Sequence, residues 1–265
     1  MIAAMPLVSV PGATLYFEEA GEGPPVLLVN GSGTDLRMQP GPLEWPVGRS
    51  FSVAAYDHRG LGRSVPDDPD HQPTMADFAA DAVALCDHLG WDRFGVLGIS
   101  FGGMVAQHIA LAAGDRVTRL VLGCTSSGGT GGASYPLHEV WRMSEEERLD
   151  TMATIMDTRA ATDPAFRDVL RSFMSGGREF APSPDGLRRQ MEARRLHDTW
   201  DRLPSLRVPT LVAAGRYDGI APLANSEALA ARIPGAELQV FEGGHGFFME
   251  DPAAWPAMTS FLLPD

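Results

Sequence analysis

One serine stands in a sequence pattern that suits a nucleophile. Gly98, Ser100 and Gly102 form a G-x-S-x-G motif, which follows a predicted buried strand and precedes a predicted helix. A tight turn between strand and helix exposes the serine hydroxyl, and the flanking glycines permit the close backbone approach that this turn needs. The N-terminus of the helix also favours developing negative charge. The motif therefore predicts nucleophilic catalysis by Ser100, and a chance turn is the alternative.

A serine nucleophile needs a base, and the base needs an acid that orients it. His245 lies among glycines just after the last predicted strand, and Asp218 follows the strand before it. The carboxyl ends of parallel strands lie at the same end of a sheet, where ligands bind. We therefore expect these side chains to converge on the serine there. His58 also follows a strand and is the alternative base. Asp57 and Asp251 are alternative acids, although a turn and a helix N-cap explain them better.

The predicted elements give these residues their positions. Short apolar runs that end in glycine or a turn indicate buried strands at Val26–Val29, Ser52–Tyr56, Phe94–Gly98, Thr118–Gly123, Thr210–Gly215 and Glu237–Phe241, with an edge strand at Leu15–Glu19. Apolar residues at helical spacing indicate helices at Met75–Leu89, Phe101–Ala113, Leu223–Arg232 and Pro252–Leu262. This alternation predicts an α/β fold with a doubly wound, mostly parallel sheet.

The alternation stops between residues 125 and 207. A glycine-rich stretch comes first, followed by a helical, methionine-rich segment in which Ser144 and Glu147 form a capping box. We expect residues 125–207 to form a helical lid, inserted after the sixth strand, over a core made of residues 1–124 and 208–265. The candidate pocket residues are Trp141, Met152, Met156, Phe173, Met191, Arg194 and Phe247. Arg194 could hold a substrate carboxylate, and a solvated helix face is the alternative.

The absence of lysine excludes several chemistries. All 21 basic residues are arginine, so no Schiff base can form and the Gly-Lys-Ser/Thr phosphate loop is missing. The formal net charge of −13 disfavours nucleic acid and anionic membranes as partners, because both attract basic proteins. An anionic substrate would have to be drawn in by local arginine, against the overall field.

The remaining composition indicates a soluble, cytoplasmic protein. Cys86 and Cys124 lie in apolar runs and do not make a disulfide framework. The N-terminus lacks the basic start of a secretion signal, and no apolar run is long enough to span a membrane. No cluster of histidine, cysteine and carboxylate has metal-ligand spacing, so we expect neither metal nor cofactor. The expected partner is a small apolar substrate, and the chain is expected to be a monomer or homodimer.

The motifs together resemble the α/β-hydrolase fold superfamily over almost the whole chain. The elbow at Ser100, the turn at Asp57–Ser64 and the later aspartate and histidine carry the resemblance, and their chain order is typical of its triads. The stretches Asn30–Met38 and Gly98–Met104 are similar to 3-oxoadipate enol-lactonases. This resemblance implies a serine hydrolase that cleaves a small carboxylic ester or lactone through an acyl-enzyme. Carbon–carbon bond hydrolysis, a biosynthetic cyclase or lyase, and a slow-turnover ligand receptor are the alternatives on this scaffold.

The turn after the first buried strand is the candidate oxyanion hole of such an enzyme. The sequence Asn-Gly-Ser-Gly-Thr-Asp-Leu begins at Asn30. The backbone N–H of Ser32 would pair with that of Phe101 to hold an oxyanion. Gly31 permits the turn, and Asn30 would brace the loop by hydrogen bonds without a titratable group. A plain glycine turn is the alternative, whereas a dinucleotide loop would need a third glycine that is absent.

Overall fold

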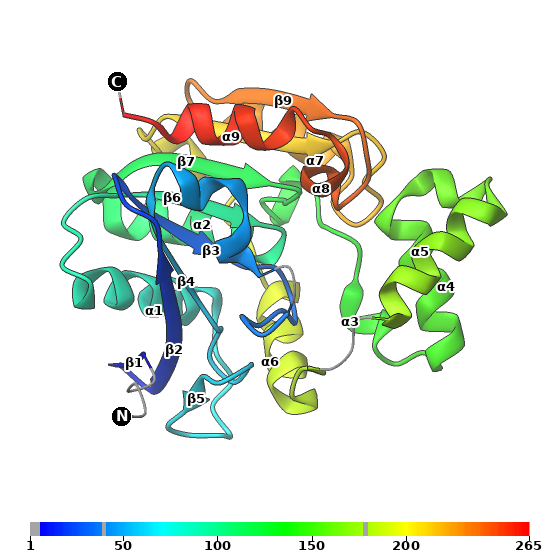
Figure 1. Cartoon of the computed structure of the whole chain (residues 1–265), viewed down its shortest axis with the longest axis horizontal. Helices are drawn as coiled ribbons and strands as arrows, with labels where there is room; N and C mark the ends of the chain where they lie inside the picture. The colour runs from blue at the N-terminus through cyan, green and yellow to red at the C-terminus, as the bar shows by residue number, and fades with distance from the viewer. Residues whose placement is uncertain (1–5, 39–40, 177–179, 265) are drawn as a thin grey trace.

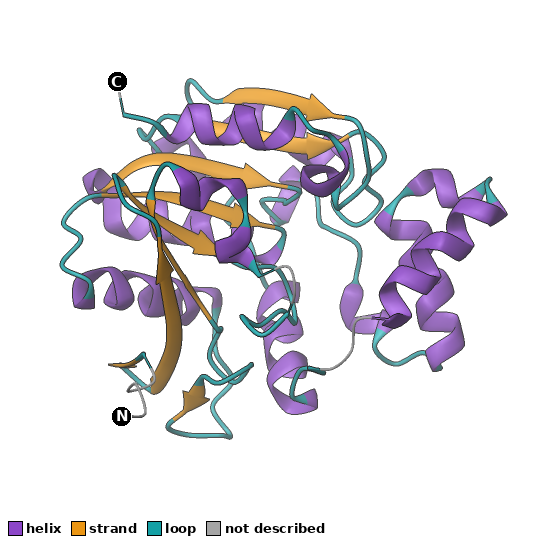
Figure 2. Cartoon of the chain, viewed as in Figure 1, coloured by secondary structure: helices purple, strands orange, loops and turns teal. Residues whose placement is uncertain are grey.

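A single twisted sheet forms the centre of the molecule. The structure, a computed structural model, describes residues 6–38, 41–176 and 180–264. The sheet has nine strands in the described ranges, in the order β1-β2-β4-β3-β6-β7-β8-β9, with β5 paired to β2 (Figures 1 and 2). The strands are Leu7–Val10 (β1), Ala13–Ala20 (β2), Pro25–Val29 (β3), Ser52–Tyr56 (β4), Val65–Pro66 (β5), Phe94–Ile99 (β6), Val117–Gly123 (β7), Thr210–Gly215 (β8) and Glu237–Phe241 (β9). All neighbours from β4 to β9 are parallel, which confirms the predicted α/β fold.

Successive residues of the central strands pack on opposite faces of this sheet. Leu27 and Val29 belong to the core shared with α1, α2 and α7, whereas Val26 and Leu28 belong to the core shared with α8 and α9 (Figure 1). These helices are Met75–His88 (α1), Phe101–Ala113 (α2), Leu223–Arg232 (α7), Phe247–Glu250 (α8) and Ala254–Leu262 (α9). Burial on both faces explains why the strands read as continuous apolar runs.

Between β7 and β8 the chain leaves the sheet and forms a helical insertion. Its helices are Leu137–Val140 (α3), Glu145–Met156 (α4), Pro164–Gly176 (α5) and Pro184–Arg195 (α6). In Figure 1 the pair α4 and α5 stands to the right of the sheet, while α6 lies closer to it. The insertion follows β7, the seventh strand along the chain, and not the sixth strand as expected. The short strands β1 and β5 were not predicted from the sequence. No helix within the described ranges is both long and apolar enough to cross a membrane.

A buried ion pair fixes the turn that follows β4. Arg59 donates from Nε and Nη2 to the carboxylate of Asp81 on α1, at 2.7 and 2.5 Å, and both side chains are almost fully buried. In the same turn the carboxylate of Asp57 accepts hydrogen bonds from the backbone N–H groups of Leu36 and Arg63. These bonds hold the loop after β4 against the loop after β3, so Asp57 serves the turn.

Removal of the buried carboxylate tests how much this ion pair contributes to the free energy of unfolding. Asp81→Asn leaves the Arg59 guanidinium buried without its counter-charge, so we expect the free energy of unfolding to fall by about 3–5 kcal/mol. Denaturant titration measures this loss. The exposed pair Arg216–Glu242 provides the control, because solvent screens an exposed pair and Glu242→Gln should leave the free energy of unfolding almost unchanged. Equal losses in the two variants would contradict the prediction.

Candidate functional site

Ser100 lies in a strained turn between β6 and α2. Its φ and ψ angles are 57° and −115°, a region that residues with a Cβ rarely adopt. The Ser100 N–H donates to the carbonyl of Gly123 at 2.8 Å, and its own carbonyl accepts the Thr125 hydroxyl at 2.8 Å. A Cβ on Gly102 would overlap the Val29 carbonyl. Glycine at that position therefore allows the first turn of α2 to press against the end of β3.

Three side chains from distant strand ends form one hydrogen-bonded chain. Ser100 Oγ lies 2.9 Å from His245 Nε2, and His245 Nδ1 lies 2.8 Å from Asp218 Oδ2. The second carboxylate oxygen, Oδ1, accepts the backbone N–H groups of Ile220 and Ala221, each at 2.8 Å. With its proton on Nδ1 donated to Asp218, the imidazole keeps Nε2 free to accept the serine proton.

The end of α4 supports the loops that carry the aspartate and the histidine. The His245 N–H donates to the Met156 carbonyl at 2.6 Å, and the Gly219 N–H donates to the Ile155 carbonyl at 2.9 Å. The last carbonyls of an α-helix have no hydrogen-bond partner within the helix, and two of those of α4 are satisfied in this way. Local sequence patterns do not reveal these bonds, which link residues 64 to 89 positions apart.

The loop after β3 lies directly against the serine. A Cβ on Gly31 would stand 3.7 Å from the Ser100 Cβ. Among the described residues, the backbone N–H groups of Ser32 and Phe101 have no hydrogen-bond acceptor. The next N–H, that of Gly33, donates to Gln190 Oε1 on α6 at 2.8 Å. Phe101 follows Ser100 in the chain and Ser32 lines the same cavity as Ser100, so these two N–H groups are the candidate donors of an oxyanion hole.

The support of this loop differs from the sequence prediction. The Asn30 side-chain nitrogen has no hydrogen-bond partner among the described residues, and this residue lines the cavity beside the serine. The Asn30 backbone carbonyl instead accepts Nε2–H of the fully buried His58, at 3.0 Å. Burial lowers the pKa of His58 to about 4, so the imidazole is neutral near pH 7. His58 is thus a support of the loop and stands apart from the serine hydroxyl.

An apolar cavity of about 340 Å³ opens beside Ser100. Three of the predicted pocket residues, Met152, Met156 and Phe173, line it. The sequence prediction missed other apolar lining residues, among them Trp45, Leu137, Ile220, Phe248 and Met249. The insertion supplies one wall, through α3, α4 and α5, and the sheet edge supplies the floor.

Three predicted pocket residues turn away from this cavity. Trp141 is 39% exposed at the surface of the insertion. Met191 is buried in the small core that the insertion shares with the turn after β4. Phe247 is fully buried and stacks on Phe241, with ring centroids 5.3 Å apart. The next residue, Phe248, reaches the cavity in its place.

Arg194 also lies outside the cavity beside the serine. It is 6% exposed, donates from Nη1 to the Tyr135 carbonyl at 2.8 Å, and lines a second, smaller cavity. The segment from Pro136 to His138 separates the two cavities, since Leu137 lines the first and its two neighbours line the second. The described lining of the cavity beside the serine therefore contains no arginine.

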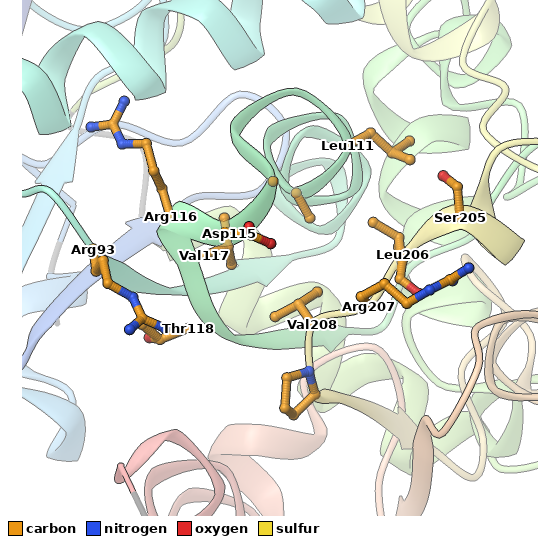
Figure 3. Close-up of a pocket in the computed structure, with 13 residues that line it drawn as sticks. Arg93, Leu111, Asp115, Arg116, Val117, Thr118, Ser205, Leu206, Arg207 and Val208 are labelled. Atoms are coloured by element: carbon orange, nitrogen blue, oxygen red, sulfur yellow. The ribbon is translucent and has the colours of Figure 1, made fainter.

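A larger cavity of about 750 Å³ lies at the opposite end of the sheet, where β7 and β8 begin (Figure 3). It surrounds the start of β7 at Val117, and Arg93, Arg116 and Arg207 stand around it (Figure 3). Its described lining has no histidine and none of the predicted site residues. Open α/β sheets bind ligands at the carboxyl ends of their strands, so the smaller cavity, which contains Ser100 and His245, is the candidate site.

The structure also brings a thiol close to the hydrogen-bonded chain. Ligand atoms of Cys124, Asp218 and His245 lie within 4.8 Å of one another, a clustering that the sequence spacing did not predict. The carboxylate and the imidazole are hydrogen-bonded to each other. Burial raises the pKa of the Cys124 thiol well above its usual value, so the thiolate that a metal prefers is disfavoured. These residues do not fit a metal site.

The chain is similar to a known protein family and to several hydrolases. Residues 24–252 match the model of the alpha/beta hydrolase fold family. A protein of Caulobacter sp. (strain K31), provisionally named carbamate hydrolase RutD, is 32% identical over 228 residues, which are 80% of this chain and 81% of that protein. The poly(3-hydroxyalkanoate) depolymerase of Ectopseudomonas oleovorans is 29% identical over 247 residues, 90% of this chain and 84% of the depolymerase. The solved structure of Est816, described as an N-acyl homoserine lactone degrading enzyme, has a TM-score of 0.76 and 26% identity, and covers 97% of this chain and 100% of its own.

The neutral state of His58 predicts sensitivity to acid. Its pKa is about 4 in the folded chain and about 6.5 in an unfolded one. Unfolding therefore takes up a proton between these values, and the stability that the neutral form contributes is lost as the pH falls from about 6.5 to about 4. In His58→Gln, the drop in unfolding free energy between pH 7 and pH 5 should be smaller by about 2 kcal/mol.

Denaturant titration of the two proteins at both pH values measures this difference. His71→Gln is the matched control, because His71 is exposed. A drop in His58→Gln as large as that of the unmodified chain would refute the assignment of a buried, neutral His58.

Proposed function

Because the chain belongs to the α/β hydrolase fold family, we propose that it is a serine hydrolase which cleaves a small, neutral carboxylic ester or lactone. The observation that carries this proposal is the chain from Ser100 Oγ through His245 to Asp218, with contacts of 2.9 and 2.8 Å, at the floor of an apolar cavity. The depolymerase and the lactone-degrading enzyme named above support hydrolysis of ester-type bonds.

The first half of the reaction transfers the acyl group to the serine. His245 Nε2 takes the proton of the Ser100 hydroxyl while the oxygen attacks the substrate carbonyl carbon. The carbonyl electron pair moves to its oxygen, and the N–H groups of Ser32 and Phe101 stabilise the negative charge. When the intermediate collapses, the bond to the alcohol oxygen breaks and His245 gives its proton to that oxygen. The acyl-enzyme on Ser100 remains.

The second half returns the enzyme to its starting state. Water gives a proton to His245 Nε2 and attacks the acyl carbon, and the same two N–H groups stabilise the new oxyanion. The bond to Ser100 Oγ then breaks, the serine recovers its proton from His245, and the acid is released. Asp218 accepts the Nδ1–H bond throughout, which fixes the tautomer and stabilises the imidazolium. We propose that residues 125–207 act as the lid that completes the cavity and selects the acyl group.

The lining of the cavity favours a neutral substrate. Four methionines and three aromatic residues are among the lining residues, and methionine adapts to ligands of varied shape. Asp35, the carboxylate among the described lining residues, is paired with Arg37 at 2.7 Å. Apart from His245, no basic side chain of the described lining could balance a substrate carboxylate.

Ser100→Ala tests the central assignment. Removal of the nucleophile should lower kcat by about 10⁶-fold, with the fold unchanged by circular dichroism. Hydrolysis of p-nitrophenyl butyrate measures the loss. Ser260→Ala is the control, because this serine is exposed on α9. Activity in Ser100→Ala within about tenfold of the unmodified enzyme would overturn the assignment. A pre-steady-state burst of nitrophenol separates an acyl-enzyme with turnover from a slow receptor.

Substrate charge tests the class of substrate. An acyl group that ends in a carboxylate must bury that charge without a cation, so kcat/KM for p-nitrophenyl hemisuccinate should be at least about 100-fold below that for the butyrate ester. The two acyl chains are similar in length, and the comparison therefore isolates the charge. Equal values, or a preference for the hemisuccinate, would exclude a neutral substrate class.

A further inference from the structure

Two hydrogen bonds hold the main chain on either side of Ser32, the candidate oxyanion donor in the loop after β3. The Thr34 hydroxyl donates to the Gly31 carbonyl at 2.8 Å. The Gly33 N–H donates to Gln190 Oε1, also at 2.8 Å. The Ser32 N–H itself has no acceptor among the described residues, so its direction depends on how its two neighbours are held.

The Thr34 bond acts on the peptide group that contains the Ser32 N–H. A trans peptide group is planar, and its C=O and N–H point in opposite directions. The Gly31 carbonyl and the Ser32 N–H belong to one such group, so the hydroxyl that holds the carbonyl also sets the direction of the N–H. Gly31 has no Cβ to restrict rotation of this group. The hydroxyl of Thr34, which lines the cavity beside the serine, therefore favours one orientation.

Gln190 holds the next peptide group from the helical insertion. Its side chain is fully buried on α6, and its amide nitrogen has no hydrogen-bond partner among the described residues. A buried amide that is only half paired is costly, and an apolar side chain of similar length would avoid that cost. A backbone N–H can only donate, so it needs the oxygen that glutamine supplies. The bond to Gly33 explains why a glutamine occupies this buried position.

Contacts with the core anchor α6 close to Gln190. A Cβ on Gly186, in the first turn of the helix, would overlap the Gly60 carbonyl, so the helix presses against the turn after β4. Arg189 donates from Nη1 to the Asp70 carbonyl at 2.7 Å. These contacts hold the helix in place, and the helix presents Gln190 to the loop after β3 at a fixed position.

We propose that Thr34 and Gln190 are positioning residues of the oxyanion hole. They hold the two peptide groups that flank Ser32, so that its N–H stays aimed at the negative charge that develops on the substrate oxygen. Through Gln190, the helical insertion acts on the rate of the chemical step as well as on the shape of the cavity. This inference rests on the proposed hydrolysis, in which Ser32 is an oxyanion donor.

Substitutions at both positions test this role. Thr34→Val removes the hydroxyl at almost constant volume, and Gln190→Met removes the acceptor at similar length. A misdirected donor weakens binding of the transition state more than binding of the substrate. For p-nitrophenyl butyrate, kcat should therefore fall about 10- to 100-fold in each variant, while KM changes less than about threefold. Thr34→Ser keeps the hydroxyl and should restore most of kcat.

Two exposed positions provide the controls. Thr162→Val removes a hydroxyl that donates to the Arg159 carbonyl at 3.3 Å, and Arg188→Met places a methionine on the same helix as Gln190. Both should leave kcat unchanged, and circular dichroism and the Tm show whether every variant is folded.

Inhibition by n-propylboronic acid gives a readout that a purely structural role would not move. The Ser100 oxygen bonds to boron while His245 takes the serine proton, and the tetrahedral adduct places a boron-bound oxygen in the oxyanion hole. The inhibition constant should rise about tenfold or more in Thr34→Val and Gln190→Met, and it should stay unchanged in the two controls.

An unchanged kcat in folded Thr34→Val and Gln190→Met would overturn this proposal and leave the hydrolase assignment in place. A loss of kcat that Thr34→Ser shares, or that leaves the boronate affinity intact, would also overturn it. Hydrolysis by the unmodified chain that does not require Ser100 would overturn both the hydrolase assignment and this proposal. If Gln190→Met does not fold, Gln190→Asn replaces it, because its amide is one carbon shorter and cannot reach the Gly33 N–H.

Discussion

The contact between the first turn of α2 and the end of β3 sets the distances on which the site depends. Gly102 touches the Val29 carbonyl so closely that no side chain fits. The turn before it forces Ser100 to a φ of 57°, a conformation that costs on the order of 1–3 kcal/mol. Bonds to Gly123 and Thr125 hold it there. Phe101 stands between the strained serine and Gly102, and its N–H, like that of Ser32 in the loop after β3, has no acceptor among the described residues.

Local patterns predicted the elements well, because each strand and helix is defined by neighbours in sequence. The ranges Ser52–Tyr56, Thr210–Gly215 and Glu237–Phe241 agree residue for residue with β4, β8 and β9. Ser100, Asp218 and His245 could be predicted to meet, since parallel strands end at one edge of the sheet. The two-residue β5 and the four-residue α8 carry too short a pattern to be recognised.

The walls of the cavity could not be predicted in the same way. Whether Phe247 or Phe248 faces it depends on how α8 packs on the sheet, and a rotation of one residue decides the outcome. Arg194 shares a helix with exposed arginines, and only the position of α6 shows that it is buried. The supports of the loop after β3 come from His58 and Gln190, which are 28 and 157 residues away from their partners in the chain. Contacts over such separations leave no periodic signal.

The helical insertion supports the loops of the core as well as covering the cavity. The C-terminus of α4 holds the main chain at Gly219 and His245, and Gln190 on α6 holds Gly33. Excision of residues 125–207 would therefore take away the acceptors that shape the loops on both sides of the cavity, along with its wall. A chimera with the insertion of another hydrolase would have to match the chain at these points, the end of α4 and Gln190. The outer faces of α4 and α5 do not hold these loops, and substitutions there should leave the geometry beside Ser100 unchanged.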